Sequence, residues 1–289
     1  MRSYLPDYPV INPTSLSETL DVLSSESNVK PLAGGTDIMV YMDTGVFPAS
    51  TLLNLYAVQD FSRTPELSED RLKLNPLSTY RHARMDQSIA DSFPMLATAA
   101  KEISVLAVQS RATWIGNVAN ASPAADGVPA LMAYDATLKL SSKDGQRDVP
   151  LHQFYQGYKQ MDLQSNELIT EIQLATTDSS WKNYYRKVGT RRFQAISKTL
   201  LAGRIKLNGD QTIEDIRLVF ASVAPYTLRA IQTESVLRGQ TLTKELIDKA
   251  TQAIQDEISP IDDIRSTEVY RRQVTANLIR DFLSSNLTK

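Results

Sequence analysis

The sequence predicts an α+β protein folded in two or three lobes, and three features of its pattern support this fold class. The N-terminal part of the chain alternates strand, loop, helix and strand. Strand-like segments at 71–74, 136–140 and 167–174 follow, with helical runs between them. After a polar break, further strand-like segments lead into two amphipathic helices, expected over 243–256 and 269–287.

The first helix is marked by its N-terminal sequence. Thr14 or Ser15 is suited to cap it, an acidic residue follows in the first turn, and leucines then recur on one face. Residues 29–33 are expected to be extended, 34–37 form a loop, and 51–55 form a buried strand. These elements make up a β-loop-α-β unit.

The middle of the chain mixes helices with strands. Helical patterns lie at 79–83, 95–103 and 128–134, whereas 113–120 is expected to be a loop around its glycine and asparagine. Asp144-Gly145 is typical of a hairpin turn between strands.

A polar break at 176–180 is the expected boundary between two domains. We expect the first domain to span 1–177, with sub-lobes of about 1–60 and 61–177, and a smaller α+β domain to span 178–289. The strand-like segments of this second domain are 196–207 and 213–223.

The charge balance excludes several classes of partner. Lysine and arginine total 31 against 33 acidic residues, a net charge of -2, so neither nucleic acid nor an anionic membrane surface is expected to bind. The N-terminus lacks the apolar region of a signal peptide, and no apolar stretch approaches the length of a membrane span. We therefore expect a cytoplasmic protein.

The scarcity of reactive side chains narrows the chemistry further. The chain has no cysteine, which excludes disulfides, thiolate nucleophiles and cysteine-ligated zinc or iron–sulfur clusters. Its two histidines, His82 and His152, are far apart in sequence, and we expect structural roles for both. Any redox chemistry must be carried by a bound organic cofactor.

Two loops rich in small residues are candidates for binding such a cofactor. The first, Ala33-Gly34-Gly35-Thr36-Asp37, lies between a strand and a helix, where paired glycines let backbone N–H groups approach an anion. The second, residues 111–126, offers hydroxyl and amide groups for sugar or phosphate oxygens. Either loop taken alone is better interpreted as an ordinary turn or polar loop, because most such segments are turns and no GxGxxG fingerprint occurs.

Together these segments resemble the FAD-binding, or medium, subunits of molybdenum hydroxylases of the xanthine dehydrogenase and carbon monoxide dehydrogenase type. Residues 31–37 look like the first FAD loop of that family and residues 111–126 look like the second. Further similar segments are 128–136, 166–172, 186–192, Val223-Ala224-Pro225 with Arg229-Ala230, and Tyr270-Arg271-Arg272. The resemblance covers essentially the whole chain in the expected order.

The resemblance implies a role for each matching position. Backbone amides of the two loops would hold the FAD pyrophosphate, and Asp126 would contact the sugar-alcohol portion. Lys187 would lie near the flavin ring, where a cation stabilises the anionic reduced form, although a solvated surface lysine is an equally good reading. The implied FAD-binding positions are Ala33, Gly34, Gly35, Thr36, Asp37, Thr113, Ile115, Gly116, Asn117, Asp126, Ile169 and Lys187.

The resemblance also implies a fold and partners. The fold would be a two-lobed FAD-binding domain of the vanillyl-alcohol-oxidase-like (PCMH) type followed by the smaller α+β domain. Electrons would come from [2Fe–2S] clusters in a small subunit, which receives them from a molybdopterin-binding large subunit, and FAD would pass them to NAD+, oxygen or another acceptor. FAD is expected to be non-covalent, because cysteine is absent and both histidines lie outside the FAD motifs. No catalytic side chain and no metal ligand is assigned to this chain.

One position departs from the family pattern. Ile115 stands where the first glycine of the second loop is expected, and Trp114 fills the preceding apolar position. A β-branched residue is disfavoured at positive φ and adds bulk where a phosphate approaches. We favour a loop shifted by one residue, in which Ile115 packs inward and Trp114 turns outward.

Two other functions stay open at this point. An FAD-less scaffold or assembly subunit would keep the fold but lose the cofactor, which Ile115 makes conceivable. A free-standing flavin oxidase would need its own substrate pocket, and the sequence has no obvious base-bearing motif or capping domain for one.

Overall fold

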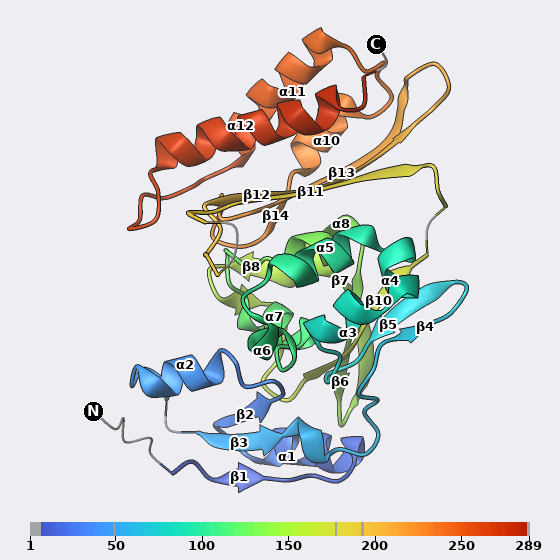
Figure 1. Ribbon diagram of the computed structural model, residues 1–289. Coiled ribbons are helices and arrows are strands. Elements are labelled where there is room, and N and C mark those ends of the chain that lie inside the picture. Colours follow the sequence, from blue (N-terminus) through green and yellow to red (C-terminus); the bar gives the residue numbers. More distant parts are fainter. Residues whose placement is uncertain (1–6, 49, 177, 192–193, 288–289) are drawn as a thin grey trace.

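The computed structural model describes residues 7–48, 50–176, 178–191 and 194–287. It confirms the α+β fold class, since sheets of three, five and four strands and one two-stranded hairpin are interspersed with helices. Figure 1 shows three tiers, with the N-terminal lobe at the bottom, a middle lobe above it, and the C-terminal sheet and its helices at the top.

The N-terminal lobe is a small parallel sheet in the order β1-β3-β2, formed by β1 (Val10–Ile11), β2 (Val29–Leu32) and β3 (Thr51–Asn54). Helix α1 (Leu16–Ser25) begins at Ser15, whose hydroxyl accepts a hydrogen bond from the Glu18 backbone N–H. Its buried leucines form a small core with those of β3. Helix α2 (Ile38–Asp43) precedes β3, and the 3₁₀ turn η1 (Leu55–Ala57) follows it.

The middle lobe is built on a sheet in the order β4-β5-β10-β6-β7, in which all neighbours are antiparallel. Its strands are β4 (Glu66–Leu67), β5 (Arg71–Leu74), β6 (Thr137–Ser142), β7 (Gly145–Pro150) and β10 (Leu168–Ala175), and a separate hairpin pairs β8 (Tyr155–Gly157) with β9 (Gln160–Met161). Its helices are α3 (Tyr80–Met85), α4 (Gln87–Ser92), α5 (Pro94–Glu102), α6 (Leu106–Gln109), α7 (Trp114–Asn120), α8 (Val128–Ala133) and α9 (Leu151–Phe154). These elements share one large apolar core.

The C-terminal tier is an antiparallel sheet in the order β11-β12-β13-β14, covered by three helices. The elements are β11 (Trp181–Val188), β12 (Thr199–Leu207), β13 (Ile213–Ala221), β14 (Leu228–Arg229), α10 (Ile231–Leu237), α11 (Lys244–Glu257) and α12 (Glu268–Ser284). Strand β12 is buried on both faces. Leu200 and Ala202 join the core of the middle lobe, whereas Leu201 and Ile205 join the core beneath the helices. One strand therefore joins the two cores.

The structure corrects two expected elements and adds a strand that was not expected. Residues 113–120 form helix α7 and no loop, because Thr113 caps the helix and Trp114, Ile115 and Val118 bury one face of it. The strand expected over 196–207 begins only at Thr199. Strand β11 was not predicted, because as an edge strand it exposes several polar side chains and lacks a clear apolar alternation.

Two expectations fall on undescribed positions. Thr177, the last residue of the expected first domain, lies outside the described residues, and so does Arg192 of the segment 186–192.

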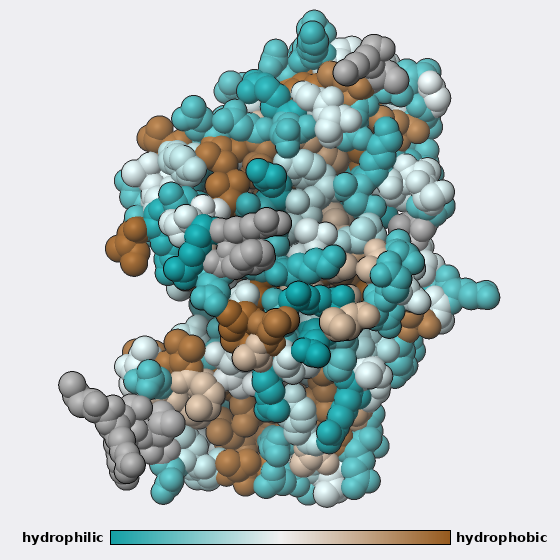
Figure 2. Space-filling view, viewed as in Figure 1, coloured by the Kyte–Doolittle hydropathy of each residue, from teal (hydrophilic) through white to brown (hydrophobic). Residues whose placement is uncertain are grey.

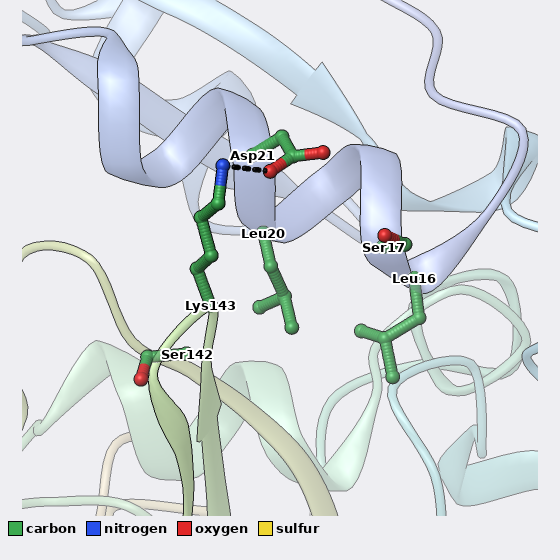
Figure 3. A pocket seen from close by; sticks show the side chains of 6 residues that line it. All are labelled: Leu16, Ser17, Leu20, Asp21, Ser142 and Lys143. Carbon is green, nitrogen blue, oxygen red and sulfur yellow. Dashed lines mark ion pairs between the residues drawn. The ribbon is translucent and has the colours of Figure 1, made fainter.

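The first two tiers also meet at the tip of the β6–β7 hairpin. Lys143 in this turn forms an ion pair with Asp21 of α1, with 2.7 Å between Nζ and Oδ1. Figure 3 shows Leu16 and Leu20 pointing from α1 toward the hairpin, beside a cavity of about 510 Å³. None of the expected FAD-binding residues lines this cavity. The ion pair is largely exposed, so it adds little to stability.

A charged cluster joins the middle lobe to the C-terminal sheet. Asp135, which follows α8 with a φ of 54°, pairs with Arg217 of β13 at 2.9 Å and with Arg229 of β14 at 2.8 Å. Arg229 also pairs with buried Glu234 of α10 at 3.0 Å. Because both guanidinium groups are mostly buried, this cluster fixes the sheet against α8.

The described helices can be compared with the length and apolarity that a membrane span needs. None of the helices within the described ranges is both long and apolar enough to cross a bilayer. Figure 2 shows polar side chains over most of the visible face, interrupted by separate apolar groups.

Gly203 tests how closely α12 packs on β12. A Cβ at this position would lie 2.7 Å from the ring of Phe282 on α12, so Gly203→Ala forces the helix away from the sheet. We expect a loss of about 1–3 kcal/mol in the free energy of unfolding, measured by urea denaturation. Gly209→Ala is the matched control, because nothing lies within 4 Å of its Cβ position. Equal stability of the two variants would contradict this packing.

Candidate functional site

The two candidate loops lie against each other. A Cβ on Gly34 would stand 2.0 Å from the backbone carbonyl oxygen of Arg111, so only glycine permits this approach of the first loop to the second. Gly35 has a φ of 74°, a left-handed conformation that favours glycine. Both glycines are thus required for distinct reasons, one for space and one for backbone conformation.

The first loop presents unused backbone donors. Among the described residues, the N–H groups of Gly34, Gly35, Thr36 and Asp37 have no hydrogen-bond acceptor. Successive unpaired N–H groups ahead of a helix form a concave donor set suited to an anion. Ala33 is half-buried at the end of β2, and the side chain of Asp37 is exposed.

The second loop opens into helix α7. The hydroxyl of Thr113 accepts a hydrogen bond of 3.0 Å from the Gly116 N–H, so that donor is already used. The N–H of Trp114 donates to the Ser78 carbonyl at 3.1 Å, whereas the N–H of Ile115 has no acceptor in the described part of the chain. The free donor on this loop therefore belongs to Ile115 and not to Gly116.

The structure resolves the position of Ile115. This residue is helical, its φ is not positive, and its side chain is 5% exposed in the core of the middle lobe. The expectation that Ile115 packs inward is confirmed. The expectation that Trp114 turns outward is wrong, because both side chains lie on the buried face of the same helix and Trp114 is fully buried.

Tyr80 supports the second loop, a role that was not expected from the sequence. Its ring stacks on Trp114 with 4.1 Å between ring centroids, and its hydroxyl donates to the side-chain carbonyl of Asn117 at 2.8 Å. A Cβ on Gly127 would lie 2.1 Å from the same hydroxyl. Asn117 therefore has its side chain fixed from below by a buried tyrosine. The only sequence sign was the position of Tyr80 at the start of a helix.

Asp126 and Lys187 form a buried ion pair. The Nζ of Lys187 lies 2.7 Å from Oδ2 of Asp126, and their side chains are 4% and 10% exposed. Burial raises the pKa of Asp126 to about 6, Lys187 opposes that rise, the Glu102 carboxylate adds to it, and the Ser197 hydroxyl lowers it. The other oxygen, Oδ1, is buried without a hydrogen-bond partner of good geometry among the described residues. Lys187 is therefore not a solvated surface lysine.

Tyr185 anchors the same segment from the neighbouring strand. Its hydroxyl donates to the Asp126 carbonyl oxygen at 2.9 Å, and burial raises its pKa well above the ordinary range. Its neighbour Tyr184 packs near Phe282 of α12, whereas Tyr185 supports the second loop.

Other positions surround this centre. Ile169 lies at the start of β10 with its side chain buried in the core, next to α7. Lys159, in the β8–β9 turn, donates to the backbone and side-chain oxygens of Asn120, and the hydroxyl of Tyr41 on α2 lies 3.4 Å from the same side chain. Asn120 thus links α2, α7 and the β8–β9 hairpin.

Both histidines have structural surroundings. The Nδ1 atom of His82 lies 3.2 Å from the Thr79 backbone nitrogen at the start of α3, completing a capping box. His152 lies in α9, beside Gln153. Burial lowers the pKa of each imidazole, so both are largely neutral near pH 7.

Family comparisons cover almost the whole chain. The FAD binding domain in molybdopterin dehydrogenase matches residues 6–176, and the CO dehydrogenase flavoprotein C-terminal domain matches residues 183–285. The chain is 29% identical over 271 residues to the glyceraldehyde dehydrogenase medium chain of Sulfolobus acidocaldarius, covering 94% of this chain and 95% of the relative. It is 25% identical over 286 residues to the carbon monoxide dehydrogenase medium chain of Hydrogenophaga pseudoflava, covering 97% of each.

Solved structures share the fold. A chain of carbon monoxide dehydrogenase from Hydrogenophaga pseudoflava superposes with a TM-score of 0.90 at 24% identity, covering 96% of both chains. A chain of quinoline 2-oxidoreductase from Pseudomonas putida superposes with a TM-score of 0.87 at 20% identity, covering 98% of this chain and 97% of the other. At these identities the superpositions establish the fold alone.

The burial of Ile115 generates a prediction for the substitution Ile115→Gly. The change removes a core side chain and leaves a cavity, so we expect a loss on the order of 2–5 kcal/mol in the free energy of unfolding. Ala119→Gly is the control, because Ala119 is exposed on the same helix and reports the cost of glycine in a helix alone, about 1 kcal/mol. Urea denaturation of both variants makes the comparison. A loss no larger for Ile115→Gly than for Ala119→Gly would contradict the packing of Ile115.

Proposed function

Because this chain belongs to the molybdopterin dehydrogenase FAD-binding family, whose members are oxidoreductase subunits, we propose that its two apposed loops and the Asp126–Lys187 pair hold one non-covalent FAD. The observation that carries this proposal is the contact of Gly34 with the Arg111 carbonyl, which brings unpaired N–H groups of both loops together. When bound, FAD would supply the electron-accepting and electron-donating ring that no side chain here can provide.

The pyrophosphate would be held by backbone donors. No described residue accepts a hydrogen bond from the N–H groups of Gly34, Gly35, Thr36 and Ile115, so these groups can donate to phosphate oxygens. Ile115 takes this part in place of Gly116, because the Thr113 hydroxyl already occupies the Gly116 N–H. A β-branched side chain is harmless there, since it points into the core while its backbone N–H remains available.

The ring and sugar-alcohol portion would lie near the ion pair. No described residue forms a hydrogen bond of good geometry with Oδ1 of Asp126, so a hydroxyl of the sugar alcohol can donate to this buried oxygen and reduce the cost of its burial. Lys187 is held at 2.7 Å by Oδ2 of the same carboxylate. Its cation would stabilise negative charge on the reduced ring, and the ion pair would keep that cation in place.

The electron path extends to partner subunits. Electrons would enter from [2Fe–2S] clusters of a small subunit, which a molybdopterin-binding large subunit reduces, and would leave FAD for NAD+, oxygen or another acceptor in the cytoplasm. Two relatives are described as medium chains of dehydrogenases, which supports a multi-subunit enzyme. The absence of cysteine in this chain is consistent with clusters held elsewhere.

An apolar surface supports docking to such partners. Ile261, Ile264, Val269 and Tyr270 are exposed around the N-terminal end of α12, with Ile264 98% exposed. Lys198 lies over the Tyr270 ring at 4.9 Å, which joins this surface to the segment that carries exposed Ile196. Exposed apolar groups in such number are typical of protein interfaces.

The division of labour follows the expected domains. We propose that 1–177, with sub-lobes of about 1–60 and 61–177, binds FAD, and that 178–289 supplies Lys187 and the partner-docking surface. In support, β10 ends at Ala175 and β11 begins at Trp181, and these strands belong to different sheets.

The proposal is tested by purifying the protein and precipitating it with acid. The purified protein should be yellow, and all flavin should appear in the supernatant because no covalent bond retains it. Flavin that stays in the pellet would contradict non-covalent binding. A colourless protein that still purifies with partner subunits would support the scaffold function, and substrate oxidation by the isolated chain would support a free-standing oxidase.

Gly34→Ala tests the apposition of the two loops. Its methyl group would collide with the Arg111 carbonyl, separate the loops and remove at least two charge-assisted hydrogen bonds to the pyrophosphate. At about 1.5 kcal/mol per bond, FAD affinity should fall by about 100-fold or more while the fold persists. Titration with FAD measures the affinity, and Gly209→Ala is the control with an unobstructed Cβ. Wild-type affinity in Gly34→Ala would remove the first loop from the site.

A further inference from the structure

Arg271, in the segment Tyr270-Arg271-Arg272, is buried at the start of α12 with a side chain only 4% exposed. Its Nη1 donates to the carbonyl oxygens of Lys198 and Ser222, both at 2.9 Å, and its Nη2 lies 2.8 Å from Oδ1 of Asp263. The planar guanidinium thus joins two backbone carbonyls of the C-terminal sheet to one carboxylate.

The Ser222 carbonyl belongs to a residue that forms hydrogen bonds with the second FAD loop. Ser222 has a φ of 64°, and in this conformation its N–H donates to the Pro123 carbonyl at 2.8 Å. Its hydroxyl donates to the Ser197 carbonyl at 3.0 Å and lies 3.1 Å from the Ser197 hydroxyl, which in turn lies 3.5 Å from the Ala124 carbonyl. The two serines therefore hold the segment that ends in Asp126.

The Lys198 carbonyl belongs to the residue just before β12, which pairs with the end of β11, the strand that carries Lys187. The N–H of Lys198 donates to the Val188 carbonyl at 2.7 Å, which closes the end of β11 directly after Lys187. Arg271 consequently binds Ser222, which holds the segment before Asp126, and Lys198, which pairs with the strand end after Lys187. Its removal is expected to loosen the backbone next to both Asp126 and Lys187.

We propose that Arg271 is a positioning residue of the FAD site, which sets the distance between Asp126 and Lys187 through Ser222, Ser197 and Lys198. The inference rests on the proposed FAD function of this pair. Arg271 itself contacts neither residue and acts through backbone carbonyls alone.

Arginine suits this role better than any other side chain. Two carbonyls and a carboxylate need several donors in one plane, and a lysine offers a single ammonium that cannot reach all three at once. Asp263 is itself oriented by the N–H groups of Arg265 and Ser266, which lower the pKa of its carboxyl against the effect of burial. The guanidinium is therefore fixed from the side opposite the FAD loop.

The pH dependence of FAD affinity reports the geometry of the pair. Asp126 faces Lys187, Glu102, Tyr80 and Tyr185, and burial keeps both tyrosines protonated over the range tested. An ionised Asp126 accepts the sugar-alcohol hydroxyl, so affinity of the wild-type protein should fall as the pH drops below about 6. If Lys187 moves away, only the Ser197 hydroxyl still opposes burial and Glu102, so the pKa of Asp126 rises and this midpoint moves to higher pH.

The experiment compares Arg271→Lys, Arg271→Met and Ser197→Ala with the control Arg272→Met. Arg272 is adjacent in sequence, but it pairs with Glu268 at 2.8 Å and donates to the Gln255 carbonyl, away from the FAD loop. FAD affinity is titrated from pH 5 to pH 8 alongside melting temperature. We expect the midpoint of the three test variants to move up by about one pH unit, so that they bind FAD about tenfold more weakly at pH 5 and about twofold more weakly at pH 7. The control should keep the wild-type midpoint.

The outcomes separate this inference from the proposed function. Wild-type affinity and midpoint in both Arg271→Lys and Ser197→Ala, even with a lower melting temperature, would overturn it and leave Arg271 a purely structural residue. These two variants decide the matter if Arg271→Met does not fold. If the wild-type protein binds no FAD, the proposed function fails, and NMR titration of the Asp126 carboxyl still tests the positioning. An unchanged titration in Arg271→Lys would then refute it.

Discussion

The ion pair between Asp126 and Lys187 is the interaction on which the site and the contact between the two halves of the chain depend. Each charge is almost completely buried, so neither tolerates the loss of the other. Asp126 ends the second loop of the middle lobe and Lys187 lies in β11, the first strand of the C-terminal sheet. Forming the pair therefore requires that the sheet be docked on the middle lobe. Burial raises the pKa of Asp126, and its Oδ1 has no hydrogen-bond partner of good geometry among the described residues. This oxygen can therefore accept a hydrogen bond from a ligand.

The surrounding structure is organised to hold this pair. Strand β12 is buried on both faces, because α8 packs on one and α12 on the other. Asp135, which follows α8, forms ion pairs with two arginines of the same sheet. Arg271 of α12 donates hydrogen bonds to backbone carbonyls next to the sheet. On the opposite side, Gly34 lets the first lobe approach the Arg111 carbonyl. The candidate cofactor site is thus formed by residues of all three tiers, and no single tier contains all of it.

Part of the site could be read from the sequence with elementary rules. Gly34 and Gly35 were identified because paired glycines between a strand and a helix suit an anion, and the structure gives each a steric or conformational need for glycine. Asp126 and Lys187 were named from a family resemblance, with no sign that they touch, because 61 positions separate them. Tyr80, Ser197 and Ser222 were missed altogether. Their hydroxyl groups form hydrogen bonds with atoms that are distant in sequence, and no local sequence pattern predicts such bonds.

The sequence by itself determined the α+β class, the first helix with a cap at Thr14 or Ser15, the glycine loop and the absence of any thiol chemistry, because propensity, capping and composition are local properties. Only the tertiary structure decided that 114–120 is a helix, that Ile115 offers its N–H while burying its side chain, and that Lys187 is buried. Each of these depends on which surfaces pack together. A short amphipathic segment is only marginally stable as a helix unless its apolar face packs on a core. A lysine side chain stays solvated unless the fold buries it beside a carboxylate.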